Sequence, residues 1–586
     1  MILVCCGTGC VAQGAMEVLK KFQQLSSVGI AVKMTGCYGF CERGPLVVIR
    51  KNGKSVFYQN VKAEGVERII TRTIGKGEIL DDLLYEDPQT KKKIIEEKEL
   101  PFYKHQKRLI LENNGKIDPT NIDDYLKLGG YKSAEKALKM EPEEIIEEIK
   151  KSGLRGRGGA GFPTGRKWES CRREKEKVKY IICNGDEGDP GAFMDSGILE
   201  GNPQLVIEGM IIGSFAIGVE RAFIYVRAEY PLAVKRLEIA LNQAREKGFL
   251  GKNIFGSGFN FDIEIVQGAG AFVCGEETAL IQSIEGKIGE PYPRPPYPAE
   301  KGVFGKPTLI NNVKTWAAVP LIVKNGSGWF SSIGTETSKG TMIFSLVGKV
   351  KNTGLIEVPM GITLRDLIFK IGGGIIGDKK FKAVQTGGPS GGCIPEKYLD
   401  LPVDYEALAR AGSIMGSGGM VVMDEDTCMV SVARYFLAFT REESCGKCVP
   451  CREGTYLMLK ILDKFVGGIA TEDDLKELEE TALMVKDTSF CGLGKTAPNP
   501  VLTTLRYFRD EYMAHIGGKC PAGVCRDLIK YEIDEQNCTG CTVCVKNCPQ
   551  NAIEGERKKP HKIIQEKCIK CGICEDVCKF DAVKKK

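Results

Sequence analysis

The sequence predicts a multidomain α/β protein that ends in a helical region and a two-cluster ferredoxin-like domain. The length of 586 residues suits about three to five domains. Strand-like and helical segments alternate up to about residue 335, and apolar residues then recur at helical spacing between 427 and 515. Two cysteine runs of the same spacing follow between 538 and 578. These three observations define the fold class.

The composition is that of an ordinary globular protein. Apolar residues make up 42% and charged residues 27% of the chain. Lysine and arginine exceed aspartate and glutamate by 82 to 76, and this charge of +6 is too small to indicate nucleic-acid or membrane-surface binding. The longest apolar stretch, Met210 to Val219, is interrupted by glycine and serine and is too short to span a bilayer. We therefore expect neither nucleic acid nor membrane as a partner.

The N-terminus and the cysteine usage indicate the compartment. No basic residues precede the first apolar residues, so we expect no signal peptide. Most of the 24 cysteines are clustered, which in an unexported chain favours metal binding over disulfides. The expected location is the reducing cytoplasm.

The pattern divides the chain into six segments. They are a small α/β domain (1–90), a charged linker (91–125), a larger α/β domain (126–335), a β-grasp module of short strands (336–425), a helical bundle (426–520) and the ferredoxin-like domain (521–586).

Individual elements are expected from periodicity. In the first segment the strands are Ile2–Val4 and Ile30–Thr35, and the helix is Ala15–Leu25. In the third segment Ile145, Ile146 and Ile149 indicate a helix. Strands of that segment are expected at Tyr180–Cys183, Ala222–Arg227 and Asp262–Val266. Helices of the bundle are expected at Ser431–Thr440, Leu457–Phe465, Asp473–Lys486 and Val501–His515.

The C-terminal cysteine runs are the most specific signal in the chain. They read Cys538-x2-Cys541-x2-Cys544-x3-Cys548 and Cys568-x2-Cys571-x2-Cys574-x3-Cys578. In this bacterial ferredoxin spacing the fourth cysteine of each run ligates the other cluster. Lys579 replaces the proline that usually follows the second run, which spares the ligands. We expect one 4Fe–4S cluster on Cys538, Cys541, Cys544 and Cys578, and another on Cys568, Cys571, Cys574 and Cys548.

A second cysteine set lies near the N-terminus. Cys5, Cys10, Cys37 and Cys41 lie in two glycine-rich loops that each follow an expected strand. Four thiolates in such loops suit a 2Fe–2S cluster, because glycine lets backbone N–H groups approach the sulfurs. Cys6 is an alternative to Cys5, and a zinc ion is the alternative metal.

A third cysteine set lies in the helical segment. Cys445, Cys448 and Cys451 are within one short loop, and Cys491 is a distant fourth ligand. This set predicts a further 4Fe–4S cluster.

Cys520 and Cys525 form a pair with two of the chain's three histidines, His515 and His561, nearby in sequence. A mixed cysteine and histidine zinc site is one interpretation, and two free thiols at a turn are the other. The remaining cysteines are expected to be neutral, buried thiols: Cys6, Cys171, Cys183, Cys274, Cys393 and Cys428.

A glycine-rich loop in the third segment predicts a phosphate-binding site. Residues 156–161 read G-x-G-x-x-G, but a helix precedes them, so they lack the strand that a Rossmann fingerprint requires. Their N–H groups can face phosphate, with Arg155, Arg157, Arg166 and Lys167 nearby. Acidic segments follow two strands at 184–190 and 274–278, where an open α/β sheet places ligand-binding groups.

These motifs resemble those of the NADH-binding flavoprotein subunit of respiratory complex I and its relatives. The resemblance covers about 140–515. It rests on Gly153-Leu-Arg-Gly-Arg-Gly-Gly-Ala-Gly-Phe-Pro-Thr-Gly165, Cys183-Asn-Gly-Asp-Glu187, Cys274-Gly-Glu-Glu-Thr278, Pro307-Thr-Leu-Ile-Asn-Asn-Val313 and Ser444-Cys-Gly-Lys-Cys-Val-Pro-Cys-Arg-Glu-Gly454.

The resemblance implies a Rossmann-like domain with FMN in the glycine-rich loop, NAD(H) stacked on it, and a 4Fe–4S cluster close by. The residues expected around FMN are Gly156, Gly158, Gly159, Lys167, Asn184, Asp186, Glu187, Gly275, Glu276, Asn311 and Asn312. The residues expected to meet NAD(H) are Phe162, Lys167, Asp189, Glu277 and Tyr297. Asp189, Phe272 and Ser170 stand where glutamate, tyrosine and phenylalanine are usual. The shorter carboxylate at Asp189 leaves NADP(H) open as an alternative.

The added terminal modules make the chain similar to the beta subunit of soluble, electron-bifurcating NAD(P)-linked iron hydrogenases. This similarity implies a thioredoxin-like N-terminal domain, a ubiquitin-like module at 336–425 and an FMN-dependent oxidoreductase without a catalytic acid–base residue. It also implies three partners: a hydrogenase catalytic subunit, a small thioredoxin-like 2Fe–2S subunit and ferredoxin. The alternatives are an electron-input subunit of an NAD-linked formate dehydrogenase or other reductase, and a non-catalytic scaffold that carries electrons.

Overall fold

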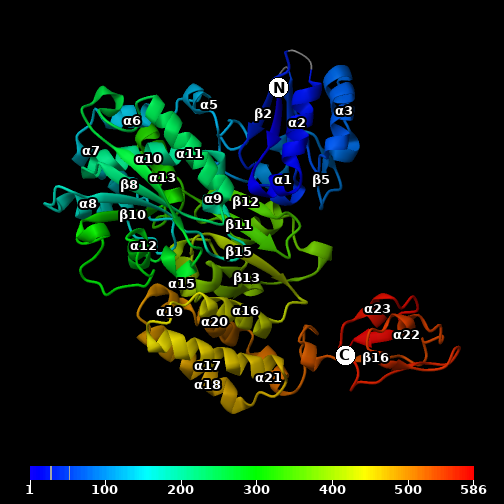
Figure 1. The fold of residues 1–586 in the computed structure, drawn as a ribbon. Coiled ribbons are helices and arrows are strands. Elements are labelled where there is room, and N and C mark those ends of the chain that lie inside the picture. The colour runs from blue at the N-terminus through cyan, green and yellow to red at the C-terminus, as the bar shows by residue number, and fades with distance from the viewer. Residues whose placement is uncertain (27–28, 52, 586) are drawn as a thin grey trace. The chain divides into compact units, whose positions relative to one another are not determined.

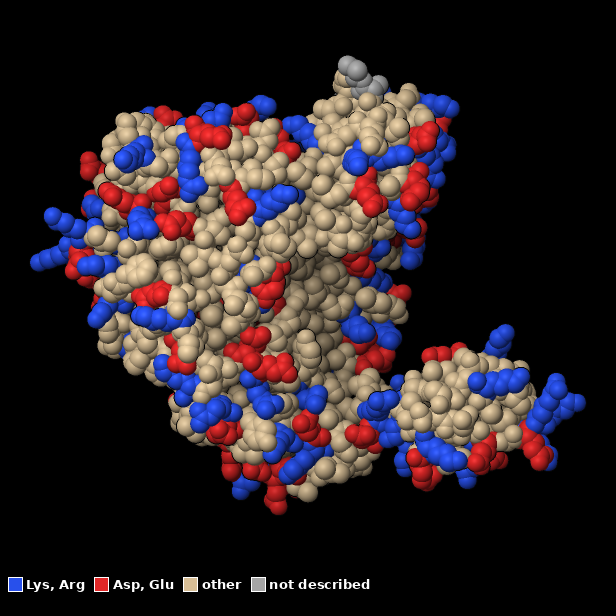
Figure 2. Space-filling view, in the orientation of Figure 1, with Lys and Arg blue, Asp and Glu red and all other residues tan. Residues whose placement is uncertain are grey.

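The computed structural model describes residues 1–26, 29–51 and 53–585, and the chain forms two compact units (Figure 1). The first unit comprises Met1–Asp424, Glu443–Lys447 and Cys491–Leu493. The second comprises Glu425–Glu442, Cys448–Phe490 and Gly494–Lys586. Among the described residues, no helix combines the length and the apolar character needed to cross a bilayer. Lysine and arginine are interspersed with aspartate and glutamate over the face drawn in Figure 2.

The N-terminal domain is a mixed four-stranded sheet in the order β2-β1-β3-β4. Its strands are β1 (Ile2–Cys5), β2 (Val32–Thr35), β3 (Val47–Lys51) and β4 (Lys54–Tyr58), and its helices are α1 (Thr8–Ala12), α2 (Ala15–Leu25) and α3 (Val66–Arg68). β1 pairs in parallel with β2 and antiparallel with β3. A βαβ unit followed by an antiparallel hairpin is the arrangement expected of a thioredoxin-like domain. The strand and helix predictions for this domain agree with the structure, which adds α1 around Cys10.

The segment 91–125 is packed, and its description as a linker was wrong. It contains β6 (Lys93–Ile94), which pairs with β5 (Tyr85–Glu86), and the short helices α4 (Pro101–Lys104) and α5 (Ile122–Lys127). Phe102 is fully buried and its ring stacks on that of Phe40 with centroids 4.2 Å apart. The many charged residues of the segment indicated a linker, but its few apolar residues pack against the neighbouring cores.

The larger α/β domain contains an all-parallel sheet in the order β10-β7-β8-β9. The strands are β7 (Tyr180–Gly185), β8 (Arg221–Arg227), β9 (Asp262–Gly268) and β10 (Thr308–Asn312). The helices are α6 (Lys132–Ala137), α7 (Pro142–Lys151), α8 (Thr164–Arg173), α9 (Met194–Gly201), α10 (Pro203–Ile217), α11 (Pro231–Glu246), α12 (Glu277–Ile284), α13 (Val313–Asn325) and α14 (Ser327–Ser331).

Three strands and α7 of this domain were predicted from the sequence, and β10 was missed. The apolar stretch that begins at Met210 lies within and just after α10, which is buried almost throughout its length. Because α10 packs on α13, which is also largely buried, apolar residues surround α10. All four strands are parallel, so their carboxyl ends meet at one edge of the sheet, where ligands bind in such folds.

The next module is a five-stranded mixed sheet in the order β12-β11-β15-β13-β14. Its strands are β11 (Thr341–Gly348), β12 (Gly354–Pro359), β13 (Phe381–Thr386), β14 (Gly392–Pro395) and β15 (Gly419–Asp424), and its helix is α15 (Tyr405–Arg410). β11 pairs antiparallel with β12 and parallel with β15. A helical segment at Asp366–Ile371 lies between the two hairpins in sequence, the arrangement expected of a β-grasp module.

The second unit begins with a helical bundle. Its helices are α16 (Met429–Glu442), α17 (Val449–Val466), α18 (Glu472–Thr488), α19 (Gly492–Thr496), α20 (Asn499–Tyr507) and α21 (Arg509–Ile516). Leu437, Leu462, Leu478 and Val485 lie in its core. The single helix predicted over Val501–His515 is two helices, because Phe508 has the non-helical dihedrals φ −136° and ψ 36°.

The C-terminal domain repeats one small motif twice. β16 (Tyr531–Ile533) pairs with β19 (Val583–Lys585), and β17 (Ile553–Glu554) pairs with β18 (Lys562–Ile563). Each half contributes one short helix, α22 (Val543–Asn547) or α23 (Ile573–Asp576). The core between them includes Cys544 and Cys574.

Candidate functional site

The glycine-rich loop lies between α7 and α8 and folds back on itself. The N–H of Gly156 donates to the carbonyl of Phe162 at 2.8 Å. Gly161 has φ +64°, and a β-carbon there would lie 2.6 Å from the Tyr405 ring, so glycine is required. A β-carbon on Gly158 would lie 3.2 Å from that of Asn312 at the end of β10. The backbone of the loop therefore lies close to the carboxyl edge of the sheet, and Gly158 places no side chain between the loop and β10.

Two of the basic residues near the glycine-rich loop contact protein groups. The Arg157 side chain is 2% exposed and donates to the carbonyls of Thr341, Arg155 and Lys339. Arg155 donates to the carbonyl of Gly161, pairs with Glu406 and lies over the Tyr405 ring. Both arginines therefore hold the loop in shape.

Lys167, the fourth residue of α8, points toward the first residue of α12. Its ammonium group forms an ion pair with Glu277 and also donates to the carbonyl of Ile310 at 2.9 Å. Arg294 approaches Glu277 to 3.6 Å and Glu276 to 3.7 Å. Glu276 is the N-cap of α12 and accepts from the N–H groups of Thr278 and Ala279. The structure thus brings together three residues that the sequence identified.

Asp186 follows β7 and is the least satisfied polar group of the site. Its side chain is 1% exposed, and neither carboxylate oxygen has a hydrogen-bond partner among the described residues. The nearest cation is Arg227, whose guanidinium lies 3.9 Å away. Burial raises the pKa of Asp186 to about 7, although Arg227 opposes the shift. A β-carbon on Gly275 would lie 3.4 Å from this carboxylate, so a side chain there would crowd it.

Glu187 is buried beside Asp186 but is fully hydrogen-bonded. Its carboxylate accepts from the N–H groups of Met194, Asp195 and Ser196, and so caps α9. Burial and the Asp195 charge raise the pKa of Glu187 to about 7. Its position indicates that Glu187 fixes the start of α9 rather than contacting a ligand directly.

The three asparagines at the sheet edge are all hydrogen-bonded. Asn184 donates to the carbonyl of Gly275 at 3.0 Å. Asn312 donates to Asp195 at 2.5 Å, and Asp195 pairs with the buried Lys314 at 2.6 Å. The neighbouring Asn311, with its amide oxygen toward Trp168, accepts from the indole Nε1 at 2.8 Å. Sequence reasoning missed Asp195 and Lys314, which sit outside the quoted acidic segments.

The other residues expected to meet NAD(H) differ in the exposed fraction of their side chains. Phe162 and Tyr297 are each 55% exposed, whereas Asp189 is partly buried. Asp189 accepts from the Ser417 hydroxyl at 2.6 Å, and burial raises its pKa to about 6. The two aromatic rings are therefore free to stack on a ligand.

The four N-terminal cysteines lie at or after the ends of β1 and β2: Cys5 ends β1, Cys10 is in α1, Cys37 follows β2 and Cys41 begins a short helix. The Sγ atoms of Cys37 and Cys41 are 3.6 Å apart, and the Cys5 thiol is hydrogen-bonded to Cys10 and Cys37, which lowers its pKa. Cys6 lies outside this set, and burial raises its pKa to about 12. Of the two alternatives, Cys5 is thus the one that the structure groups with the others.

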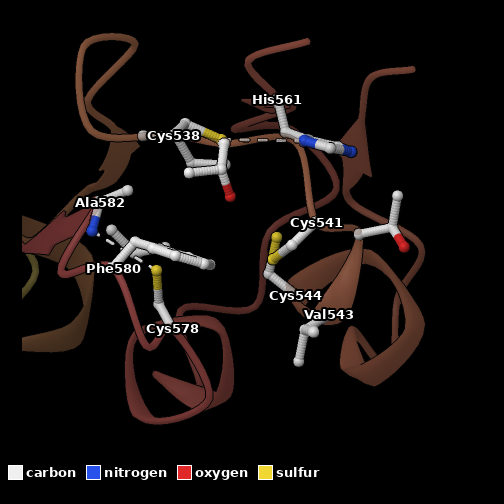
Figure 3. Close-up of a pocket in the computed structure, with 12 residues that line it drawn as sticks. Cys538, Cys541, Val543, Cys544, His561, Cys578, Phe580 and Ala582 are labelled. Carbon is white, nitrogen blue, oxygen red and sulfur yellow. Dashed lines mark hydrogen bonds between the residues drawn. The ribbon is translucent and has the colours of Figure 1, made fainter. Parts of the chain in front are cut away.

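The ferredoxin-like domain contains two cavities, and the structure groups their cysteines as the spacing predicts. The first, of about 330 Å³, is lined by Cys538, Cys541, Cys544 and Cys578 (Figure 3). The second, of about 340 Å³, is lined by Cys548, Cys568, Cys571 and Cys574. In each cavity the fourth cysteine comes from the other run.

The remaining expected cluster ligands lie around α17 and α19. Cys448 is the N-cap of α17 and Cys451 is in its first turn. Cys491 directly precedes α19, and Cys445 lies in the loop before α17.

The structure brings together three of the four residues of the predicted zinc set and places the fourth elsewhere. The ligand atoms of Cys428, His515, Cys520 and Cys525 all lie within 4.8 Å of one another, and all four residues are buried. His515 Nε2 is 3.4 Å from the Cys428 sulfur and 3.2 Å from that of Cys525, and its Nδ1 lies 2.7 Å from the Glu511 carbonyl. His561 is instead in the first ferredoxin cavity.

Cys428 was expected to be an isolated neutral thiol and replaces His561 in this set. It lies 87 residues before His515 in sequence, so its spacing gave no signal. Cys171 and Cys183 remain isolated, and burial raises the pKa of both thiols, that of Cys171 to about 12.

Family models match four parts of the chain. The Nuo51 FMN-binding domain matches residues 149–321, and the NADH-ubiquinone oxidoreductase-F iron-sulfur binding region matches 431–515. The SLBB domain matches 343–394, and the 4Fe-4S dicluster domain matches 531–584.

Curated relatives and solved structures agree with these models. The NADP-reducing hydrogenase subunit HndC of Solidesulfovibrio fructosivorans is 57% identical over 82% of this chain and 98% of that subunit. An NADH-quinone oxidoreductase subunit of Aquifex aeolicus is 46% identical over 69% of this chain and 93% of that subunit. An NAD+-reducing NiFe hydrogenase crystal structure is 31% identical, with a TM-score of 0.63 over 88% of this chain and 84% of that chain. The chain therefore belongs to the Nuo51 family of NAD(P)-dependent FMN iron–sulfur oxidoreductase subunits, which complex I and hydrogenases share.

Proposed function

We propose that the chain binds FMN between the glycine-rich loop and the carboxyl edge of its parallel sheet. The observation that carries this proposal is Asp186, whose two buried carboxylate oxygens meet no partner among the described residues. A polar group buried in this way is costly unless a ligand supplies donors. Gly158 and Gly275 keep the adjacent backbone free of side chains. The residues present thus fit a flavin with a polar ring edge and a ribityl chain.

Removal of the Asp186 carboxylate should weaken FMN binding. We expect Asp186→Leu to raise the dissociation constant about 5- to 150-fold, because a lost hydrogen bond of this kind costs about 1–3 kcal/mol. The measurement is flavin fluorescence of acid extracts and of titrated, flavin-stripped protein. Glu264→Leu is the control, since Glu264 is an exposed residue of β9 paired with Arg221. Full FMN content in Asp186→Leu would contradict the assignment.

The dinucleotide is proposed to bind on the outer side of the flavin, between Phe162 and Tyr297. NAD(H) is the expected ligand, and NADP(H) is the alternative that the name of HndC supports. When bound, FMN would supply the exchange between hydride pairs and single electrons. Lys167 and Glu277 would orient the dinucleotide. Comparing kcat/KM for NADH and NADPH, with a suitable acceptor dye, decides between the two ligands.

We propose one 2Fe–2S cluster at the N-terminal cysteines and three 4Fe–4S clusters at the other three sets. Each ferredoxin cavity is lined by three cysteines of one run and one cysteine of the other run. This grouping supports the two ferredoxin clusters. At the N-terminal set, the Cys37 and Cys41 sulfurs lie 3.6 Å apart, and Gly44 leaves no side chain beside the Cys10 sulfur. Four thiolates in glycine-rich loops suit a two-iron centre. Iron and sulfide analysis with EPR of the reduced chain tests the count.

The four-residue set of Cys428, His515, Cys520 and Cys525 is proposed to bind zinc. Its donors are the soft and borderline ligands that structural zinc sites use, and the Glu511 carbonyl orients the imidazole. We expect Cys428→Ser to lose about one zinc per chain by metal analysis, whereas Cys171→Ser should retain it. Retention of zinc in Cys428→Ser would contradict the zinc assignment and favour the interpretation of these cysteines as free thiols.

We further propose that the chain works in a complex with a hydrogenase catalytic subunit and a small 2Fe–2S subunit. The relation to hydrogenase subunits supports this proposal. Division of electron pairs between ferredoxin and the hydrogenase is the proposed activity of that complex. Purified complex that couples NAD(P)H to hydrogen without any dependence on ferredoxin would exclude this division.

A further inference from the structure

The two halves of the ferredoxin-like domain are related by a shift of 30 residues. Equivalent backbone contacts recur: Asp534 N–H donates to Ala582 O at 2.7 Å, and Ile564 N–H to Ala552 O at 2.8 Å. The N–H groups of Ala552 and Ala582 also approach the sulfurs of the preceding cysteines, at 3.3 and 3.4 Å. The backbone contacts around the two cavities are therefore almost the same.

The cavities differ at one buried polar position of this repeat. His561 lines the first cavity, and Tyr531, which precedes it by 30 residues, lines the second. Both side chains are buried, at 2% and 6% exposure. The other lining side chains that are buried are apolar or cysteine. The repeat thus places an imidazole at one site where the other has a phenol ring.

The imidazole points at a cluster ligand. His561 Nδ1 is 3.8 Å from the sulfur of Cys538, as Figure 3 shows by a dashed line. A β-carbon on Gly555 would lie 2.6 Å from the ring, so the absence of a side chain there lets the backbone pack against the imidazole. His561 Nε2 meets no hydrogen-bond partner among the described residues.

These contacts select one tautomer when Cys538 is a cluster thiolate. A thiolate only accepts hydrogen bonds, so an imidazole with its proton on Nε2 would face it with a second acceptor. The tautomer with the proton on Nδ1 donates to the sulfur instead. Hydrogen bonds to cluster sulfurs are one of the levers that set reduction potential, because they stabilise the more negative reduced state.

We infer that His561 donates a hydrogen bond to the Cys538 thiolate and gives the first ferredoxin cluster a higher reduction potential than the second. This inference rests on the proposed placement of the two clusters. The first cluster, held by Cys538, Cys541, Cys544 and Cys578, is then the electron acceptor of the pair. His561 acts on the potential as a positioning residue and is not itself a ligand.

The test is a redox titration of the full-length, cluster-loaded protein followed by EPR at one fixed pH. We expect H561F to lower the ratio of reduced to oxidised first cluster about tenfold at the wild-type midpoint, equivalent to about 59 mV. H561N, whose amide can place an N–H near the position of Nδ1, should recover part of the shift. Y531F is the matched control on the second cluster and should leave the first unchanged.

A second measurement compares the wild type with H561F by pulsed EPR. The chain has three histidines, so labelling with 15N-histidine permits a pulsed EPR search for an imidazole nitrogen coupled to a reduced 4Fe–4S cluster. We expect such a coupling in wild type and its loss in H561F. Unchanged potentials in iron-replete H561F, or no coupling in wild type, would overturn the inference. Iron content separates these results from failure of the cluster proposal, which would show as missing iron in wild type.

Discussion

Three carboxylates follow β7 within four residues, and burial affects each of them differently. Asp186 and Glu187 have pKa values raised to about 7, and Asp189 has one raised to about 6. Glu187 is compensated by three N–H groups of α9 and Asp189 by a hydroxyl. Asp186 lacks such compensation among the described residues. This carboxyl therefore destabilises the flavin-free protein when it ionises.

Asp186→Asn should stabilise the flavin-free protein in a pH-dependent way. The folded pKa lies above the unfolded value near 3.8, so the stability of the wild type falls as pH rises from about 4 to about 7. The advantage of the variant should grow over this window and level off above it, to at most about 4 kcal/mol. Thermal unfolding followed by tryptophan fluorescence reports it, since Trp168, Trp316 and Trp329 all lie in this domain.

Asp189→Asn is the comparison: the Asp189 carboxylate accepts a hydrogen bond from Ser417 and its pKa is raised less, to about 6, so the gain in stability should be smaller. A difference between wild type and Asp186→Asn that stays constant from pH 5 to pH 8 would show that Asp186 is solvated or paired in solution.

At the scale of elements, glycine controls how closely the cysteine loops approach each other. Gly44 lies after the short helix at Cys41–Arg43, in an extended conformation that any residue can adopt. A β-carbon there would lie 2.7 Å from the Cys10 sulfur, shorter than a normal contact. The glycine is thus required by its proximity to the Cys10 sulfur, a proposed cluster ligand, and not by backbone strain.

Gly44→Ala should therefore damage the N-terminal cluster selectively. We expect loss of more than about half of the 2Fe–2S EPR signal while the 4Fe–4S signals remain, because the added methyl group displaces Cys10. Gly65→Ala is the matched control, since nothing lies within 4 Å of a β-carbon there. A complete 2Fe–2S signal in Gly44→Ala would mean that Cys10 can move without loss of the cluster, or is not a ligand.

At the scale of the whole molecule, the first unit joins the N-terminal domain to the flavin domain through buried polar contacts. Arg236 of α11 is 2% exposed and donates to the carbonyls of Cys6 and Glu200 at 2.6 and 2.5 Å. The Glu200 carboxylate accepts from the N–H and hydroxyl of Thr8 at 2.9 and 2.5 Å. The helix α1, which begins at Thr8 and carries Cys10, is thereby fixed to the larger domain.

Arg236→Leu should loosen this attachment without removing FMN. Two buried carbonyls would lose charged donors, at a cost of about 1–3 kcal/mol, so the Thr8 amide should exchange hydrogen about 5- to 150-fold faster. Hydrogen exchange with mass spectrometry of the N-terminal peptide measures it. Arg245→Leu, on the same helix and 37% exposed, should change it little. Equal exchange in both variants would place the stability of the interface elsewhere.

The sequence by itself determined what local spacing encodes. Cysteine runs identified both ferredoxin ligand sets, since ligands three residues apart must converge on one centre. Periodicity located β7, β8 and β9, the helices α2 and α7, and the long helices of the bundle, because the spacing of apolar residues within an element reports which face of it is buried. The strand β10 was missed, although its last two residues, Asn311 and Asn312, were selected from the motif that contains them.

Only the tertiary structure decided which distant groups meet. Cys428 joins His515 through the packing of the bundle, and Arg155 and Arg157 connect the glycine-rich loop to Glu406 and to the carbonyls of Thr341 and Lys339. The segment 91–125 is packed because a few apolar residues bury their surface in cores built from other parts of the chain. Such contacts depend on the free energy of the whole fold, and a local sequence pattern does not determine them.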